Sequence, residues 1–322
     1  MTKKPDLILH LPVHKTGSTA LQQALHVSEA LLNARNFTYL PRFTHSFQHD
    51  DLTRKTGENL RTLLVSMKEA ASDRNIILST EKLHLADDDK ISDLMTAIIG
   101  IFSDYDIKVI VYLRRQDDAF SSFYNQIVKF GTATDTTGQA FAQYGKYFDY
   151  ERYLRLFNEQ LRGTDQLIAR LYDRSALVDR DIVADFLSII GLQMEMPDRP
   201  TRIINHSLEK SVFQLKRSMN QHLDGSPPEL IQSLAGVLAD ASTRINNGSP
   251  DTNILSDLER DLIMASFAAS NQRMFQQYLG GAVFAEEKKS EKPYDSSFEL
   301  VMPAVLARLS RYLYHINKVA KR

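Results

Sequence analysis

The sequence has 322 residues, of which 43% are hydrophobic and 25% charged, and this apolar content can form a large core without disulfides or metals. Lys and Arg total 39 against 40 for Asp and Glu, so the chain lacks the positive field with which proteins hold nucleic acids, and no nucleic-acid partner is expected. The absence of cysteine excludes disulfides, thiolate metal sites and a cysteine nucleophile.

The N-terminal apolar stretch gives no sign of a targeting segment. It runs only from Leu7 to Val13 and contains His10, so it is too short and too polar for a signal peptide. No apolar run in the sequence approaches the roughly 20 residues that span a bilayer. We therefore expect a cytoplasmic protein without a transmembrane segment.

Short apolar runs alternate with segments of helical periodicity along the first 200 residues. The runs are apolar on both faces, which is typical of buried strands in a parallel sheet. The expected strands are residues 6–12, 75–79, 107–113 and 166–172. The expected helices are residues 19–34, 59–71, 90–102, 119–130, 150–160 and 182–190. This alternation predicts an α/β fold, a three-layer sandwich around a mostly parallel sheet.

After about residue 200 the pattern becomes helical. Two long helices are expected, at residues 254–279 and 298–318, with a charged linker at 285–297 that contains Pro293. A polar loop is expected at residues 132–138. We expect a single domain over residues 1–322, in which the α/β core (1–200) is covered by helical C-terminal additions (201–322).

The segment after the first expected strand has the composition of an anion-binding loop. It reads HKTGST, from His14 to Thr19, and enters an amphipathic helix. A helix N-terminus offers unpaired N–H groups and partial positive charge. Gly17 permits a tight turn, Ser18 and Thr19 add hydroxyl donors, and Lys15 adds a full charge. The simpler alternative is a strand-to-helix turn with Ser18 or Thr19 as the N-cap.

The order of residues in this loop differs from that of an ATP-binding loop. A Walker A motif, GxxxxGK[ST], places its lysine after the last glycine, whereas Lys15 precedes Gly17 and the upstream glycine is absent. Lys-Thr-Gly-Ser-Thr between a strand and a helix resembles the 5′-phosphosulfate loop of sulfotransferases, which use 3′-phosphoadenosine-5′-phosphosulfate. By this resemblance, the donor is bound by Lys15, Thr16, Gly17, Ser18 and Thr19, and His14 is expected to bind it too. Lys15 would also contact the bridging oxygen of the leaving group.

A second motif lies at the end of the expected strand at residues 107–113. KVIVYLR ends in Arg114, and Ser122 stands eight residues later. An arginine and a serine at this spacing can converge on one dianion. The pair resembles the 3′-phosphate element of sulfotransferases, and Tyr124 matches the tyrosine that follows it there. Gln116 stands where family members often have proline. On its own, the pair also fits a surface ion-pair cluster.

Two residues are candidates for the base that deprotonates the acceptor. Glu81 ends the second expected strand in NIILSTEKLHL, which directs it toward the crevice at the strand ends. It resembles the catalytic glutamate of bacterial carbohydrate sulfotransferases with a Ser-Thr-Glu strand end. His84 is the rival, because histidine titrates near neutral pH. Alternatively, Glu81 is a helix-start carboxylate and His84 a core histidine.

The resemblance covers most of the chain, from Leu7 to Phe284. It implies a sulfotransferase that transfers a sulfuryl group to a hydroxyl acceptor, a small molecule or a glycan such as a carbohydrate, glycolipid or polysaccharide precursor. No metal is expected, because the nine histidines are scattered and form no His-Glu-x-x-His motif. The alternatives are an ATP-dependent small-molecule kinase and a non-catalytic nucleotide-binding protein of a glycan pathway. The sequence does not indicate the acceptor or the oligomeric state.

Overall fold

The computed structural model describes residues 4–40, 43, 47–192, 207–243 and 252–285. The chain divides into two compact units. The first comprises residues 1–115, 146–200 and 266–286, and the second comprises residues 116–145, 201–265 and 287–322. The expectation of a single domain over residues 1–322 stays a prediction.

The first unit contains a parallel sheet of five strands among the described residues, in the order β2-β3-β1-β4-β5. The strands are β1 (Asp6–His10), β2 (Phe37–Tyr39), β3 (Asn75–Ser79), β4 (Asp106–Leu113) and β5 (Gln166–Leu171). β1 lies at the centre, paired with β3 and β4, so the loops after these three strands emerge at one edge of the sheet. The predicted α/β fold with a parallel sheet is confirmed.

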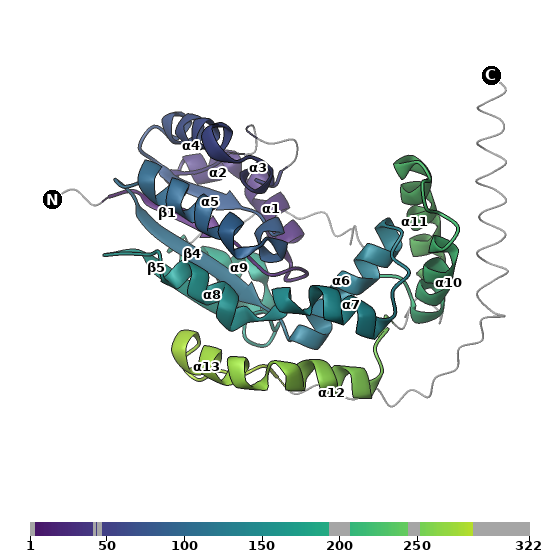
Figure 1. Cartoon of the computed structure of the whole chain (residues 1–322). Coiled ribbons are helices and arrows are strands. Elements are labelled where there is room, and N and C mark those ends of the chain that lie inside the picture. Colours follow the sequence, from purple (N-terminus) through teal and green to yellow (C-terminus); the bar gives the residue numbers. More distant parts are fainter. Residues whose placement is uncertain (1–3, 41–42, 44–46, 193–206, 244–251, 286–322) are drawn as a thin grey trace, which may run out of the picture. The chain divides into compact units, whose positions relative to one another are not determined.

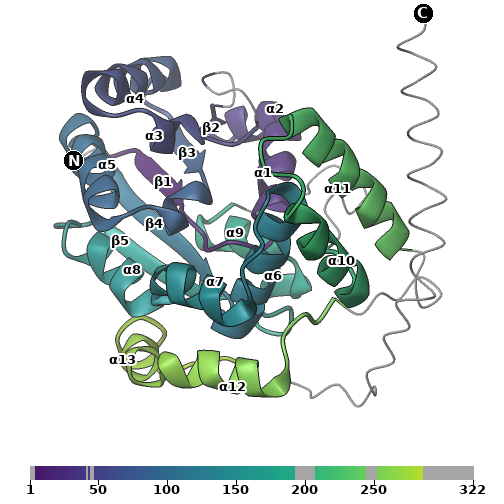
Figure 2. The same cartoon turned by 45° about the vertical axis from the view of Figure 1, so that its right-hand side comes forward.

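Helices cover both faces of this sheet. On one face, residues of β1, β3 and β4 form a buried core with α1, α2 and α9. On the other face, α8 packs on β4 and β5, and α5 packs between α4 and α8 (Figures 1 and 2). The helices of this unit are α1 (Ser18–Val27), α2 (Glu29–Asn33), α3 (Asp51–Arg54), α4 (Gly57–Ala71), α5 (Asp88–Ile101), α8 (Tyr150–Asn158), α9 (Ile182–Ile189) and α13 (Ala268–Tyr278).

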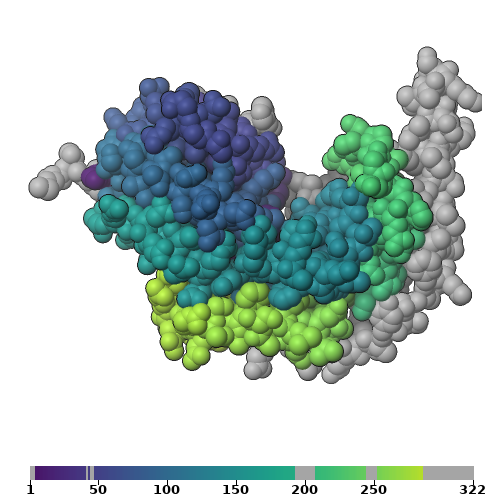
Figure 3. Space-filling model, in the orientation of Figure 1, coloured from purple at the N-terminus to yellow at the C-terminus, as the bar shows by residue number. Residues whose placement is uncertain are grey.

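Apolar side chains explain why these layers form. The strands β1 to β4 are buried along almost their whole length, and Leu7, Ile8 and Leu9 of β1 are fully enclosed, as expected when helices cover both faces. The edge strand β5 is mostly half-buried. Short 3₁₀ helices at Lys82–Leu85, Gly145–Phe148 and Val178–Arg180 complete the connections. In the space-filling view, the α5 and α8 segments, blue to teal, cover most of this face of the sheet (Figure 3). The α/β unit is therefore a three-layer sandwich.

The second unit is helical in its described residues. It contains α6 (Gln116–Phe130), α7 (Thr137–Tyr144), α10 (Lys210–Asn220), α11 (Pro228–Ser242) and nearly all of α12 (Asp257–Ser266). α6 is its central helix, with α7, α10 and α11 packed against it. The Lys216 ammonium donates to the carbonyls of Val128 and Gly131 at 3.0 and 3.1 Å, which fixes α10 to the end of α6.

Four sequence predictions about elements are wrong in detail. The helix predicted at residues 19–34 breaks at Ser28, whose backbone (φ −99°, ψ 14°) leaves the helical range; serine favours helix ends over helix interiors. The helix predicted at 254–279 breaks at Phe267 (φ −108°), because apolar spacing continues across one non-helical residue. The first strand, predicted at residues 6–12, ends at His10. Pro12 cannot continue it, because proline has no N–H to donate to a neighbouring strand.

The fourth error is the polar segment predicted as a loop at residues 132–138. Its end already belongs to α7, where Thr136 forms a capping box with Gln139; a threonine followed three residues later by glutamine is a known helix start. The strand β2 was not predicted, because its three residues are too few to establish a period. The predicted helix at 298–318 lies outside the described residues, as does the predicted linker beyond Ala285.

Candidate active site

The loop between β1 and α1 turns sharply directly before the helix. Lys15 has φ 66° and Gly17 has φ 76°, and α1 begins at Ser18 with Gly17 as its N-cap. Thr16, fully buried, donates from its hydroxyl to the Val13 carbonyl at 2.8 Å. A non-glycine residue with positive φ costs free energy, and such residues cluster at ligand sites. The loop therefore has the strand–turn–helix geometry that binds anions.

Ser18 connects this loop to the end of β3. Its hydroxyl donates a hydrogen bond to Oε2 of Glu81, although 63 positions separate the two residues. Glu81 follows the last strand residue by two positions and is half-buried. The structure therefore places the predicted base beside the first turn of α1.

Arg114 approaches the same loop from the end of β4. Its Nη1 atom donates to the backbone carbonyl of Lys15 at 3.3 Å. Since β1 lies between β3 and β4, the residues that follow these strands converge on the β1 loop. The structure thus brings together Lys15, Ser18, Glu81 and Arg114.

The electrostatics of this cluster follow from burial and from its three charges. Burial lowers the pKa of Lys15, the Glu81 carboxylate opposes that shift and Arg114 adds to it. Burial likewise lowers the pKa of His14, against the effect of Glu81. A partly desolvated ammonium beside a second cation gains stability from a bound anion. The cluster can hold a phosphate or sulfate group and accept a proton on Glu81.

His84, the rival base, is placed differently from Glu81. It is fully buried, and the rings of Phe148 and Tyr153 meet it edge-on at centroid distances of 5.3 and 5.5 Å. Burial holds the pKa of His84 well below its usual value, and His14 lowers it further. The ring centroids of His14 and His84 are 5.7 Å apart. His84 is thus an enclosed neutral ring behind the loop.

The residues predicted to bind a 3′-phosphate fall in both units. Ser122 is half-buried on α6, in the second unit, so its predicted pairing with Arg114 stays a prediction. Tyr124 is buried, donates to the Asp135 carbonyl and accepts from Arg217 Nη1 at 3.3 Å. Tyr124 therefore has protein partners of its own. Thr19 is half-buried in the first turn of α1.

Sequence reasoning missed two neighbours of the site. Tyr172, directly after β5, lies so close to Gly17 that a Cβ atom at Gly17 would be 2.8 Å from the Tyr172 hydroxyl oxygen. The segment His49–Asp50 lies against the end of β3, where the Ser79 amide donates to His49 Nδ1 at 3.1 Å. No local pattern marks these residues, because each reaches the site from a distant part of the chain.

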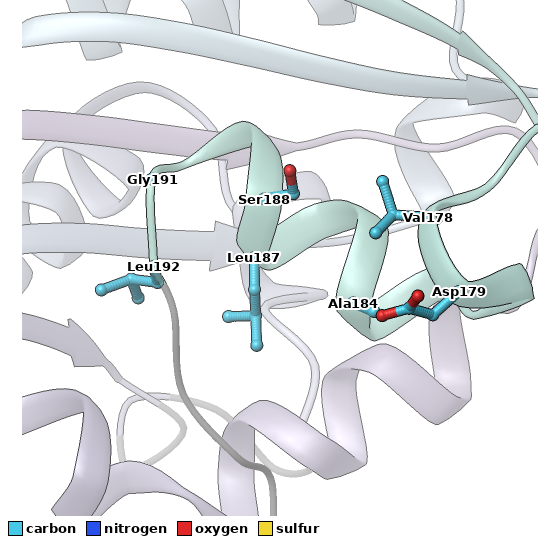
Figure 4. Close-up of a pocket in the computed structure, with 7 residues that line it drawn as sticks. All are labelled: Val178, Asp179, Ala184, Leu187, Ser188, Gly191 and Leu192. Atoms are coloured by element: carbon cyan, nitrogen blue, oxygen red, sulfur yellow. The ribbon is translucent and has the colours of Figure 1, made fainter.

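A surface hollow of about 420 Å³ lies elsewhere in the first unit. Figure 4 shows it between the Val178–Arg180 turn and α9, with Leu187 and Leu192 among its lining residues. None of the predicted site residues lines this hollow. It therefore does not mark the predicted nucleotide site.

Within the described part of the chain, no helix has both the length and the apolar character needed to cross a bilayer. In the same residues, no group of three or more His, Asp or Glu is arranged to hold a metal ion. That the reaction needs no metal stays a prediction.

Fold and site together define an α/β protein with a cationic strand–turn–helix loop and a carboxylate beside it. No protein-family model matches the sequence. A protein of Archaeoglobus fulgidus, described as uncharacterized, is 30% identical over 176 residues, which are 54% of this chain and 46% of that protein. The chain thus spans less than half the length of this relative.

Two solved structures are similar to the chain. A sulfotransferase from Alicyclobacillus acidocaldarius has a TM-score of 0.39 and 12% identity, covering 86% of this chain and 97% of its own. A sulfotransferase domain from the curacin biosynthetic pathway has a TM-score of 0.37 and 12% identity, covering 83% and 99%. Both structural neighbours are thus sulfotransferases.

Proposed function

We propose that the protein is a sulfotransferase that moves the sulfuryl group of 3′-phosphoadenosine-5′-phosphosulfate to a hydroxyl group. One observation carries the proposal: Lys15, Glu81 and Arg114 follow three adjacent strands and meet around one loop, joined by the Ser18 and Arg114 hydrogen bonds. The order of residues in the HKTGST loop, with its lysine ahead of the glycine, supports a phosphosulfate donor over ATP.

The proposed reaction assigns one task to each charged group. Glu81 takes the proton of the acceptor hydroxyl, and the acceptor oxygen attacks sulfur in line. The bond between sulfur and the bridging oxygen breaks, and its electron pair stays on that oxygen as the terminal 5′-phosphate oxygen of the product. Lys15 neutralises this developing charge. As in phosphoryl transfer, positioning and electrostatic stabilisation supply most of the rate.

Glu81 is a better candidate for the base than His84. A base must come within hydrogen-bond reach of the proton that it removes. Glu81 is partly exposed and lies beside the loop, whereas His84 is fully enclosed by aromatic rings. In this proposal His84 therefore supports the wall behind the loop and does not touch the acceptor.

The acceptor is proposed to be a glycan or a glycolipid precursor. This class of acceptor is supported by the Ser-Thr-Glu strand end, which resembles that of bacterial carbohydrate sulfotransferases, with Glu81 at the matching position. Lys15 and Arg114 supply the positive charge for the donor, so the proposal does not require a metal ion.

Ligand binding and transfer together test the proposal. In thermal-shift experiments, adenosine 3′,5′-bisphosphate without metal should raise the melting temperature more than 5′-AMP or ATP with Mg²⁺. Radiolabelled donor should then label one pool among methyl glycosides, lipid-linked sugars and phenols. Glu81→Gln should reduce transfer by about 10² to 10⁴-fold, whereas the exposed Glu58→Gln should not.

Two results would count against a sulfotransferase. Stronger stabilisation by ATP with Mg²⁺ would indicate a kinase. Stabilisation by the bisphosphate without label transfer to any of the three pools would indicate a nucleotide-binding protein without this catalysis.

A further inference from the structure

Asp50 contacts both residues that flank Glu81 in the sequence. Its Oδ1 atom accepts a hydrogen bond from the Thr80 hydroxyl at 3.1 Å, and its Oδ2 atom lies 3.2 Å from the Lys82 ammonium. The Lys82 amide in turn donates to the Thr80 hydroxyl oxygen at 3.3 Å. One carboxylate therefore closes a ring of contacts around the position of the proposed base.

The residue before Asp50 fixes the same chain segment through its backbone. The His49 amide donates to the Ser79 carbonyl at 2.9 Å, and the Ser79 amide donates back to His49 Nδ1 at 3.1 Å. On the other side, the Thr80 amide donates to the His10 carbonyl of β1 at 3.1 Å. Hydrogen bonds from His49 and from β1 therefore hold the chain on both sides as far as Thr80. The Asp50 side chain adds contacts to the residue before Glu81 and to the residue after it.

The contacts of Asp50 with Thr80 and Lys82 form what we call the Asp50 clamp, and its two arms differ in burial. Asp50 is 8% exposed and Thr80 is fully buried, so their hydrogen bond is shielded from water. The Lys82 side chain is 47% exposed, and its arm is weaker for that reason. The buried arm holds the residue before Glu81, and the exposed arm restrains the residue after it.

We infer that Asp50 is a positioning residue for Glu81: through Thr80 and Lys82 it sets the direction from which the Glu81 carboxylate reaches the acceptor. The inference rests on the proposed function, since it needs Glu81 as the base. Asp50 does not itself exchange a proton with the acceptor. Small displacements of a catalytic group are costly, because about 1 Å of misplacement can lower a rate about 10²-fold.

The test compares Asp50 variants with a neighbouring carboxylate. Asp50→Asn keeps an oxygen that can accept from Thr80 but loses the charge opposite Lys82, whereas Asp50→Ala loses both arms. Asp51→Asn is the matched control, because Asp51 is also buried and its ion pair is with Arg54, at 3.8 Å. Each variant is assayed with radiolabelled donor and the acceptor pool that wild type labels, and kcat is expressed per site that binds adenosine 3′,5′-bisphosphate in calorimetry.

A selective loss of kcat is expected. Asp50→Ala should lower kcat by about 10 to 100-fold and Asp50→Asn by less, while the KM for the donor and the affinity for the bisphosphate stay within about twofold, since the contacts of the clamp are made with Thr80 and Lys82. Normalising to binding sites removes the effect of a lower folded fraction. Asp51→Asn should match wild type.

A double substitution distinguishes positioning from a purely structural role. In a Glu81→Gln background, where no base remains to be positioned, Asp50→Asn should lower the residual kcat by less than about twofold. An equal factor in both backgrounds, or a loss no greater than that of Asp51→Asn, would overturn the inference. If both Asp50 variants fail to fold, Lys82→Met replaces them, because the Lys82 side chain is 47% exposed and Asp50 keeps its hydrogen bond from Thr80 in this variant. It should lower kcat in wild type and not in Glu81→Gln.

The outcomes also separate this inference from the proposed function. A wild-type protein that labels none of the acceptor pools refutes the sulfotransferase proposal and the positioning role with it. A wild-type protein that transfers sulfate while Asp50→Ala and Lys82→Met match it refutes the positioning role alone.

Discussion

Arg114, at the end of β4, donates from its guanidinium to the backbone carbonyl of Lys15 at 3.3 Å. Lys15 has a positive φ of 66°, a conformation that costs a non-glycine residue about 1 to 2 kcal/mol. A contact to its carbonyl helps hold the peptide in this orientation. Arg114 therefore shapes the loop, and its guanidinium, with five N–H donors in total, is also the proposed ligand of the 3′-phosphate.

Arg114→Lys tests both roles of this residue. Lysine keeps the charge but loses the planar fork of donors, so affinity for adenosine 3′,5′-bisphosphate should fall by about tenfold. Calorimetry with the bisphosphate and with adenosine 5′-phosphosulfate makes the comparison. The loss should be greater for the bisphosphate if Arg114 binds the 3′-phosphate, and equal for the two ligands if it only holds the loop. Arg115→Lys serves as the neighbouring control.

Gly17→Ala should disturb the same loop for two separable reasons. Alanine at φ 76° is strained, and its Cβ would lie 2.8 Å from the Tyr172 hydroxyl oxygen. Gly163 has φ 62° but open space around its Cβ position, so Gly163→Ala reports the backbone cost alone, about 1 to 2 kcal/mol.

Urea denaturation of the two glycine variants measures the difference. Gly17→Ala should be destabilised more than Gly163→Ala, and adding Tyr172→Phe should recover part of the excess by removing the hydroxyl. Equal losses for the two glycines would mean that Tyr172 moves away without cost.

The fold could be predicted from the sequence because apolar runs and helical periodicity are local patterns that recur along the chain. β3 was predicted with its observed bounds, and β4 to within one residue, since runs of buried aliphatic residues need no tertiary information. The strand β2 was missed because three residues establish no period. The break at Ser28 was missed because the apolar spacing of α1 continues into α2.

The site could be predicted only where its residues belong to motifs. Lys15, Ser18, Glu81 and Arg114 were chosen from strand ends, and the order of strands in the sheet brings them together. The clamp residue Asp50 could not be found in this way. It is one of two adjacent aspartates, a pattern that is typical of an exposed charged surface. Its proposed role follows only from its contacts with Thr80 and Lys82 in the structure.

Acid should destabilise the fold through its buried histidines. Burial lowers the pKa of His10 to about 3 and that of His49 to about 4, both below the ordinary value of about 6.5. The unfolded chain therefore binds protons that the folded protein excludes. Above about pH 6.5 the two histidines are neutral in both states, and their contribution to stability is fully present. It is lost as pH falls toward the folded pKa values, so each histidine lowers the free energy of unfolding by about 2 to 3 kcal/mol at pH 4.5.

His49→Asn should make this acid sensitivity smaller. The asparagine side-chain oxygen can replace Nδ1 as the acceptor for the Ser79 amide, but it does not titrate. Denaturant titrations at pH 7 and pH 4.5 should show a difference in unfolding free energy that is about 2 kcal/mol smaller than in wild type. The exposed His26→Gln is the control. If His49→Asn and wild type lose the same stability, then His49 is not protonated on unfolding in this range.

Arg260, in the second unit, offers a comparison between a buried and an exposed ion pair. Its Nη1 atom lies 2.9 Å from Asp117, whose side chain is fully buried, and 3.1 Å from Asp118. Arg260→Met should destabilise this unit by about 3 to 5 kcal/mol, because it leaves the Asp117 carboxylate buried without its cation. Arg273→Met removes an arginine that is 58% exposed from its pair with Glu151, and it should cost about 1 kcal/mol or less.

The double substitution Arg260→Met with Asp117→Asn decides whether the buried charge is the cause. Because asparagine is neutral, the double variant should recover a large part of the stability that Arg260→Met loses, as measured by urea denaturation followed by circular dichroism. If the double variant is no more stable than Arg260→Met, the loss comes from the contacts of Arg260 with Asn253, at 2.8 and 3.1 Å. In that case the guanidinium stabilises the unit chiefly through the neutral hydrogen bonds that it donates to Asn253, which precedes α12.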